Sequence, residues 1–392
     1  MEGTINIDSL TGMPTGDLRD GVSGEISVNQ LATLSATSIK LGDSIGNSTN
    51  FGRLVFNSAG SVTIGEDSSM MVAGPSTAGG GLALSSTGEM RLDGTIDVTG
   101  DTMLSAAGTI EVNAKLNGSG SVLLVATDNI VVDAEMTAST FNLSSDDDVQ
   151  VRSQVTASDL IDLSAGADGT GGIEITSTGR LETTAAGSDV TLATGADAGD
   201  VLLTGSMIAL DQVTVTSDAG SVNGSGRITG ESVSLNAETG LGSTTLLTTS
   251  ATNVSAITTS GAIEVENTLV SAVLASSLVT GNGAVDFVQL GGGDLTVGVV
   301  SASTLAMIEN QAGSVTLDVT LNSDSLSVMA TGDLSDGASG EITVNQLATL
   351  SAASITLGDS AGNSTNFGRL VFNSTGSVTI GEDSSMTVAG PS

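Results

Sequence analysis

The chain has no cysteine and no histidine among its 392 residues. Without cysteine there is no disulfide framework and no thiol chemistry. Without histidine the chain lacks the commonest general base and, with cysteine also absent, the usual transition-metal ligands. Tryptophan and tyrosine are absent too, so neither ring is available to stack on a sugar. Because nucleophile, base and stabiliser cannot all be supplied, we predict that the chain is not an enzyme.

Positive charge is scarce, with nine Lys and Arg against 44 Asp and Glu and a net charge of −35. The basic residues occur singly, as at Arg53, Arg91 and Lys115. Because phosphate binding needs clustered Lys and Arg, we predict that neither nucleic acid nor an anionic membrane surface is a partner. We expect the acids, such as Asp97 and Glu111, to lie on outward strand positions or in turns, where they stay solvated.

Long apolar runs are missing as well, and no stretch of about 18 apolar residues could span a bilayer. The first residues, Met1-Glu2-Gly3-Thr4, carry neither a basic nor an apolar region, so we expect no signal peptide in this chain. The absence of cysteine and an acidic composition rich in Thr, Ser, Gly and Asn suit a protein exported by bacteria. We therefore expect an extracellular or cell-surface location.

What the chain does have is a repeat, because apolar residues return about every 20 positions between Leu82 and Leu163. The three columns are Leu84, Leu104, Leu124, Leu143 and Leu163; Met90, Ile110, Ile130 and Val149; and Ile96, Leu116, Met136 and Val155. Short alternating runs such as Ile96-Asp97-Val98 indicate strands, and Gly, Asp, Asn and Ser between them indicate turns. The pattern predicts an all-β fold, a parallel β-solenoid (β-helix) with about 20 residues and three short strands per coil.

Other fold classes fit the pattern poorly. Glycine is too frequent for helices, and no run keeps the helical i, i+3, i+4 spacing for three turns. Disorder is the ordinary interpretation of a Gly- and Ser-rich acidic chain, but 39% hydrophobic residues in strict columns argue against it. The general crossover preference of parallel strands favours a right-handed coil.

A long duplication sets the domain organisation. Residues 13–76 recur at residues 329–392, an offset of 316, with nine differences. We therefore predict that residues 1–316 are one long solenoid repeat unit, that residues 317–392 begin the next copy, and that the solenoid is continuous. We expect the chain to be a window of a longer tandem array. The alternative is that Met1 is a true start and the bare ends stack between molecules.

The duplicated segment holds four of the six phenylalanines, Phe51 and Phe56 with their counterparts Phe367 and Phe372. Aromatic residues at equivalent coil positions usually stack inside a wide corner of the core, so we predict that these side chains are buried. The alternative makes Phe51 an exposed contact for a neighbouring chain. A loop at Gly166 to Gly172 is expected to lengthen the next coil by about nine residues at one corner, and the register is unclear between Leu241 and Gly293.

The acidic turns are the remaining candidates for a catalytic or metal site. Asp146, Asp147 and Asp148 form the densest cluster, but adjacent acids in a strand-like segment point apart, so we predict no catalytic residue there. Calcium could use Asp-rich turns, yet Asp168 in GADGTG and Asp294 in GGGD are lone fragments of the glycine-rich calcium repeat. We predict no cofactor-binding or metal site, with calcium left open as an alternative.

The runs SGSVLLVATDNIVVDAEM (119–136), AAGTIEVNAKLNGSG (106–120) and TASDLIDLSAGADG (156–169) resemble the repeats of large secreted bacterial β-helix proteins. Those proteins are the filamentous-haemagglutinin-like adhesins and related giant cell-surface repeat proteins. The resemblance implies an extracellular role in adhesion, matrix or fibre building.

From these observations we expect a structural protein. A rigid acidic β-solenoid would form the shaft or building unit of an extracellular filament, sheath or surface layer, with end-to-end or lateral self-assembly. The alternative is a cell-surface adhesin whose loops, such as Gly166 to Gly172, bind a glycan or a host surface.

Overall fold

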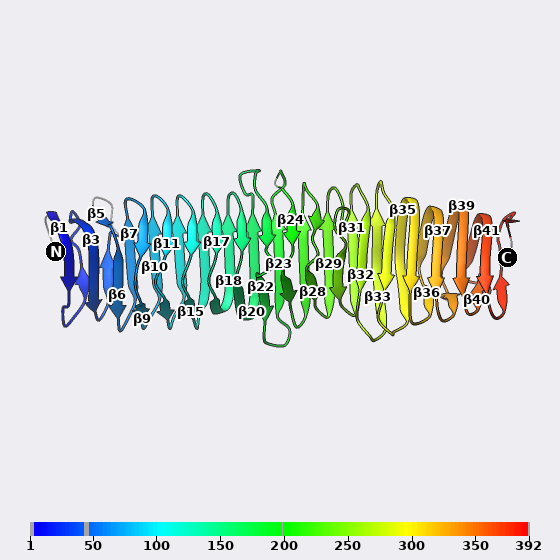
Figure 1. Cartoon of the computed structure of the whole chain (residues 1–392), viewed down its shortest axis with the longest axis horizontal. Helices are drawn as coiled ribbons and strands as arrows, with labels where there is room; N and C mark the ends of the chain where they lie inside the picture. The colour runs from blue at the N-terminus through cyan, green and yellow to red at the C-terminus, as the bar shows by residue number, and fades with distance from the viewer. Residues whose placement is uncertain (1–3, 43–46, 198, 391–392) are drawn as a thin grey trace. The chain divides into compact units, whose positions relative to one another are not determined.

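The computed structural model describes residues 4–42, 47–197 and 199–390, which form strands joined by turns (Figure 1). The chain divides into two compact units, Met1–Gly199 and Asp200–Ser392. Each unit is a parallel β-solenoid, as the sequence predicted. Residues 1–3, which enter the expectation about a signal peptide, and Ser392 lie outside the described residues. Among the described residues, none belongs to a helix long and apolar enough to cross a membrane.

The strands of the first unit are short, and most have three to six residues. They are β1 (Thr4–Gly12), β2 (Leu18–Arg19), β3 (Glu25–Ala36), β4 (Ile39–Leu41), β5 (Ser48–Phe51), β6 (Leu54–Ser58), β7 (Val62–Glu66), β8 (Met70–Val72), β9 (Ser76–Ala78), β10 (Leu82–Ser86), β11 (Met90–Leu92), β12 (Ile96–Val98), β13 (Thr102–Ala106), β14 (Ile110–Val112), β15 (Leu116–Gly118), β16 (Ser121–Ala126), β17 (Ile130–Val132), β18 (Met136–Ser145), β19 (Val149–Val151), β20 (Gln154–Ala165), β21 (Ile173–Ile175), β22 (Arg180–Thr183) and β23 (Asp189–Thr194).

The second unit contains longer strands that bend round a corner without a break. Its strands are β24 (Val201–Leu203), β25 (Ser206–Ile208), β26 (Gln212–Ser217), β27 (Val222–Asn223), β28 (Arg227–Thr229), β29 (Ser232–Ala237), β30 (Leu247–Ser250), β31 (Asn253–Thr258), β32 (Ile263–Asn267), β33 (Val273–Thr280), β34 (Val285–Gln289), β35 (Leu295–Asn310), β36 (Val315–Leu317), β37 (Thr320–Ala330), β38 (Leu334–Asp336), β39 (Glu341–Ala352), β40 (Ile355–Leu357), β41 (Ser364–Ser374), β42 (Val378–Ile380) and β43 (Thr387–Val388).

The regular block of the first unit has three strands per coil. Strands β10, β11 and β12 pair in parallel with β13, β14 and β15, which pair with β16, β17 and β18. Leu84 lies opposite Leu104, Met90 opposite Ile110, and Ile96 opposite Leu116, so the three predicted columns are confirmed. Alternate residues point inward because successive side chains of a strand lie on opposite faces. Each buried aliphatic side chain contributes about 1.5–3 kcal/mol, and each coil buries its neighbours on both sides.

Glycine fixes the tightest corner of this block, the one that follows β11. A Cβ atom on Gly94 would lie 2.3 Å from the carbonyl oxygen of Gly74 in the preceding coil. A side chain at residue 94 would therefore force the backbone of this corner to shift, although the next two coils carry Ala114 and Ala134 at the equivalent position.

The insertion predicted after β20 has the expected size, but its residues are not all at the predicted corner. Phe141 pairs with Ile161, 20 positions on, whereas Val149 pairs with Ile173, 24 on, and Val155 with Leu181, 26 on. Leu163 pairs with Leu192, an offset of 29, so the extra nine residues are shared among three corners. The single-corner prediction was wrong because each turn can lengthen alone while the strands between turns keep their register.

The duplicated segment folds in the same way in both units. β3 and β39 have equivalent bounds, and Ile39 pairs with Val62 as Ile355 pairs with Val378. Phe51, Phe56 and Phe367 are buried as predicted, so the alternative of an exposed Phe51 is wrong. Phe372 is half-buried. The division at residue 316 stays a prediction.

Candidate functional site

Turn aspartates are bound to the next coil. The backbone N–H of Ser121 donates to Asp101 Oδ1 at 2.9 Å, that of Ser221 donates to Asp200 at 2.7 Å, and that of Ser314 donates to Asp294 at 2.9 Å. The expectation that turn acids are merely solvated is therefore incomplete. Stacked coils lie about 4.8 Å apart, which brings a turn carboxylate within reach of a free amide in the following turn.

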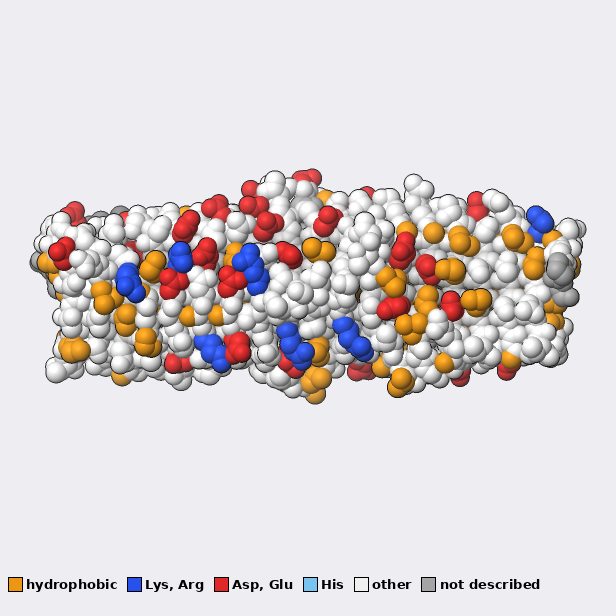
Figure 2. All heavy atoms as spheres, in the orientation of Figure 1, with side chains coloured by type: hydrophobic (Ala, Val, Ile, Leu, Met, Phe, Trp, Pro, Cys, Tyr) orange, Lys and Arg blue, Asp and Glu red, His pale blue; other side chains and the backbone are white. Residues whose placement is uncertain are grey.

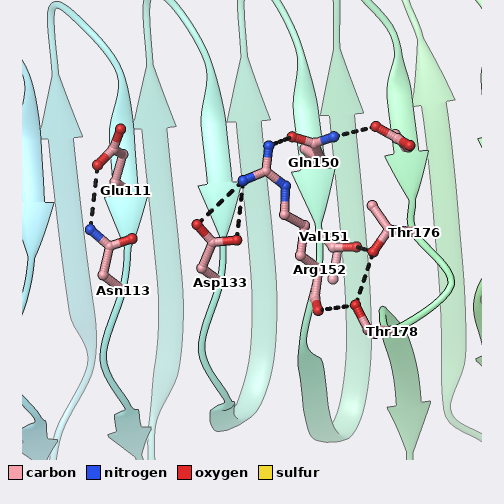
Figure 3. A network of polar contacts seen from close by, with 9 residues as sticks. Glu111, Asn113, Asp133, Gln150, Val151, Arg152, Thr176 and Thr178 are labelled. Atoms are coloured by element: carbon pink, nitrogen blue, oxygen red, sulfur yellow. Dashed lines mark hydrogen bonds and ion pairs between the residues drawn. The ribbon is translucent and has the colours of Figure 1, made fainter.

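Outward side chains of the first unit form ladders from coil to coil (Figure 3). Asn113 Nδ2 donates to Asp93 at 2.9 Å and to Glu111 at 3.3 Å. Arg152 donates to both carboxylate oxygens of Asp133, at 3.3 and 3.4 Å, and also to Gln150. These contacts satisfy the polar groups among themselves and tie neighbouring coils together.

The basic residues of the first unit interleave with acids and do not gather (Figure 2). Arg91 Nε lies 3.3 Å from Glu111, and Arg180 Nε lies 2.9 Å from Glu182. The hydrogen bond to Arg180 lowers the pKa of Glu182, and the same bond raises the pKa of Arg180. Because Arg91 and Arg180 each face a carboxylate, these positive charges offer little attraction to a phosphate.

The structure brings two sequence-predicted candidates to one corner. The loop from Gly166 to Gly172 follows β20, and the Asp146–Asp148 turn lies in the coil before it. Thr170 Oγ1 donates to Asp168 at 2.9 Å, and the Gly172 amide donates to Asp148 at 2.7 Å. The loop is thus anchored on the acidic turn, which the sequence did not indicate because the two segments lie in different coils.

The acids at these corners are the candidates for a metal site. Among the described residues, no group of three or more Asp or Glu side chains is placed to hold an ion. Asp294, the acid of the GGGD fragment, accepts the amide N–H of Ser314. The fragment is therefore used to join coils.

Sequence analysis missed a buried glutamate. Glu66 ends β7, is 2% exposed, and accepts a hydrogen bond from the Phe51 backbone amide through Oε1. Its other oxygen, Oε2, is buried and has no hydrogen-bond partner. Burial raises the pKa of Glu66 to about 8, and the charge of Asp67 adds to the rise. The signal was present, since alternation from Val62 and Ile64 places Glu66 on the inward face.

A buried polar column in the second unit was also missed. Asn267 Nδ2 donates to Gln289 Oε1 at 2.9 Å and to the Ala251 carbonyl at 3.0 Å, while Thr249 Oγ1 donates to Asn267 Oδ1 at 3.1 Å. Thr249, Asn267, Gln289 and Asn310 are each at most 1% exposed. These polar residues stand where the other coils have aliphatic ones, which is why the register between Leu241 and Gly293 was unclear.

Carboxylates stack on an outer face of the same unit. Glu264 lies directly opposite Asp286 in the next coil. Burial raises the pKa of Asp286, and the charges of Glu264 and Glu309 add to the rise. Like charges at cross-strand positions oppose each other, so this patch costs stability near neutral pH.

No family model, curated protein or solved structure matches the chain. The resemblance to the filamentous-haemagglutinin-like adhesins therefore rests on the repeat pattern and the β-solenoid fold. Many of the polar groups described above join one coil to the next.

Proposed function

We propose that the chain is a structural protein, a rigid acidic β-solenoid that forms the shaft or building unit of an extracellular filament, sheath or surface layer. The observation that carries the proposal is the constant register of the apolar columns in the regular block of the first unit, from Leu84 through Leu104 and Leu124. Parallel ladders and close-packed columns resist bending and local opening, which suits a stiff structural element.

Two further features support this proposal. The turn aspartates and outward ladders consume polar groups that a ligand site would leave free. The same coil sequence also folds in the same register in both units, as expected of a building element used repeatedly.

Immunogold electron microscopy of the producing cells tests the proposal. Antibodies against this chain are expected to label extracellular filaments, a sheath or a surface layer. Label confined to the cell interior would contradict it. A denaturing agarose gel of the native polypeptide, with peptide mapping across the 316-residue junction, then separates the two forms. A mass several-fold above 38.4 kDa favours a shaft made of one covalent chain, and 38.4 kDa favours separate building units.

The adhesin alternative has one observation in its favour, the exposed Asp168 and Thr170 of the loop anchored on the acidic turn. Glycan-array binding by the whole chain is the test, with Thr170→Ala as the loop variant. Saturable binding that is lost in this variant would favour the adhesin. The control is Thr137→Ala, which removes an outward hydroxyl from a strand of the same unit.

A further inference from the structure

One outer face of the second unit mixes carboxylates with apolar side chains. Two neighbouring columns of outward residues on β32, β34, β35 and β37 form it. The first column is Glu264, Asp286 and Met307, each opposite the next. The second column is Glu266, Val288, Glu309 and Met329. Figure 2 shows acidic and hydrophobic side chains interleaved on this part of the unit, here called the acidic-apolar face.

The chain supplies no cation to the acidic-apolar face. Its sequence has no Lys or Arg between Arg227 and Arg369. Arg227 donates to Thr268, just past the end of β32, at 3.1 Å. Among the described residues, no ion pair involves an acid of this face. A cation that neutralises the face must therefore come from outside the chain.

Neutral groups contact some of these acids. Thr248 Oγ1 donates to Glu266 at 2.8 Å, and Gln311 Nε2 donates to Glu309 at 3.0 Å. Asp286 Oδ1 is buried and has no hydrogen-bond partner. A hydrogen bond from a neutral donor leaves the charge of a carboxylate in place, so the acids of the face still repel one another.

Outward acids of the first unit have cations of their own. Arg91 Nε lies 3.3 Å from Glu111 Oε2. Arg152 donates to both carboxylate oxygens of Asp133, at 3.3 and 3.4 Å. A partner that brings cations to the acidic-apolar face makes from outside the kind of contact that the first unit makes within itself.

The apolar side chains of the face add a second requirement. Met329 is 47% exposed, and Val288 and Met307 are half-buried. Coils lie about 4.8 Å apart and alternate residues of a strand about 7 Å apart, so each apolar side chain has a carboxylate beside it. A metal ion would leave the apolar side chains uncovered, and among the described residues no group of three or more acids is placed to hold one. The face therefore fits a polypeptide that carries both kinds of side chain.

We propose that the acidic-apolar face binds a basic polypeptide segment in which Lys or Arg residues alternate with apolar ones. The cations of the segment lie against Glu264 and Asp286, and its apolar side chains cover Met307 and Met329. Neutralising the stacked carboxylates relieves their repulsion, so charge and apolar burial both favour binding. The inference goes beyond the proposed function, because a filament, sheath or surface layer can form without this contact.

The test uses fluorescence anisotropy of labelled synthetic peptides with the full 392-residue chain. A peptide of alternating lysine and leucine is expected to bind saturably, with an affinity that falls as salt screens the charges. Two peptides of the same length separate the two contributions. A lysine-serine peptide keeps the charge, a serine-leucine peptide keeps the apolar side chains, and each should bind more weakly.

A charge variant locates the binding. Glu264→Gln combined with Asp286→Asn relieves repulsion between acids, so the fold is retained. Binding of the lysine-leucine peptide should weaken about fivefold, as expected for the loss of two exposed ion pairs. The matched control is Glu231→Gln combined with Glu341→Gln, which removes two charges outside the face. Glu231 precedes β29 and Glu341 begins β39 in the same unit, and this control should bind like the wild type.

An apolar variant tests the other half of the contact. Met329→Ser should weaken binding of the lysine-leucine peptide and leave binding of the lysine-serine peptide unchanged. Its control is Met103→Ser in the first unit, because Met103 is 49% exposed and lies outside the face. That control should bind both peptides like the wild type.

Equal binding of the lysine-leucine and lysine-serine peptides, or unchanged binding by the charge variant, would overturn the inference. The net charge of −35 would then explain the attraction without this face. Calcium binding or self-association that is lost in the same charge variant would assign the face to a metal ion or to a second copy, and would overturn it too. The immunogold experiment decides the structural function separately, because the label does not depend on this contact.

Discussion

At the scale of single residues, the structure buries the carboxyl group of Glu66, which water would otherwise solvate. A carboxyl buried in the core is stable there as the neutral acid, and an ionised one would need a partner that Oε2 lacks. The group therefore links the stability of its coil to pH.

Glu66→Gln is predicted to stabilise the protein at alkaline pH. The folded-state pKa, about 8, lies above the ordinary value of 4.5, so the wild type loses stability as pH rises from about 4.5 to about 8. The glutamine keeps an acceptor for the Phe51 amide and removes the ionisation, so the gain at pH 8.5 should be about 4–5 kcal/mol. Urea unfolding at pH 4.5 and 8.5 measures it. A gain of the same size at both pH values would contradict the burial argument.

Phe56→Ala and Phe372→Ala are predicted to differ although the local sequences nearly match. Phe56 is fully buried, so its truncation should cost about 3–5 kcal/mol. Phe372 is half-buried and should cost less. Chemical denaturation of both variants gives the comparison. Equal losses would show that the coil above Phe56 contributes little to its environment.

At the scale of elements, the aspartates in the turns act as caps between coils. Asp294→Ala should cost about 1 kcal/mol because the amide of Ser314 loses its acceptor. Asp294→Asn, which keeps an oxygen at the same place, should retain most of the stability. Thermal unfolding near neutral pH distinguishes the two variants, and equal losses would mean that charge, not the hydrogen bond, carries the effect.

Prediction of the elements from sequence succeeded where one chemical signal decided the outcome. Leu104, Ile110 and Leu116 could be assigned because inward strand positions need aliphatic side chains at a constant spacing. Turns need no aliphatic side chains at a constant spacing, so the sequence could not show that the insertion is shared among three turns. Asn267 was missed for a different reason, since a polar residue inside a column is stable only when neighbouring coils supply its partners, and sequence does not show which residues those are.

The same limits applied to predicting the candidate site from the sequence. The aspartates at 146–148 and the loop at Gly166–Gly172 were each recognised from composition, but their contact depends on which turns share a corner. Glu66 could have been predicted from strand alternation alone.

At the scale of the whole molecule, charge governs behaviour in solution. Residues 1–199 carry 7 basic and 26 acidic residues, and residues 200–392 carry 2 and 18, so both units are strongly negative. That charge holds molecules apart, and it disappears near the isoelectric point of about 4.1. Light scattering should therefore rise steeply as pH falls towards 4 at low salt. A chain that stays monodisperse at its isoelectric point would show that charge is not what keeps the molecules apart.

The constant offset between β10, β13 and β16 also bears on how such a chain can evolve. Removing residues 83–102 would join Leu82 to Met103. The strands that follow would then stack on the preceding coil in the same register as the removed strands did. Removing half as many would set apolar positions against turns throughout the following coil. A deletion or insertion is thus tolerated when it removes or adds a whole coil. Unequal recombination between repeats can therefore lengthen or shorten the molecule without changing the contacts between coils, whereas a small deletion cannot.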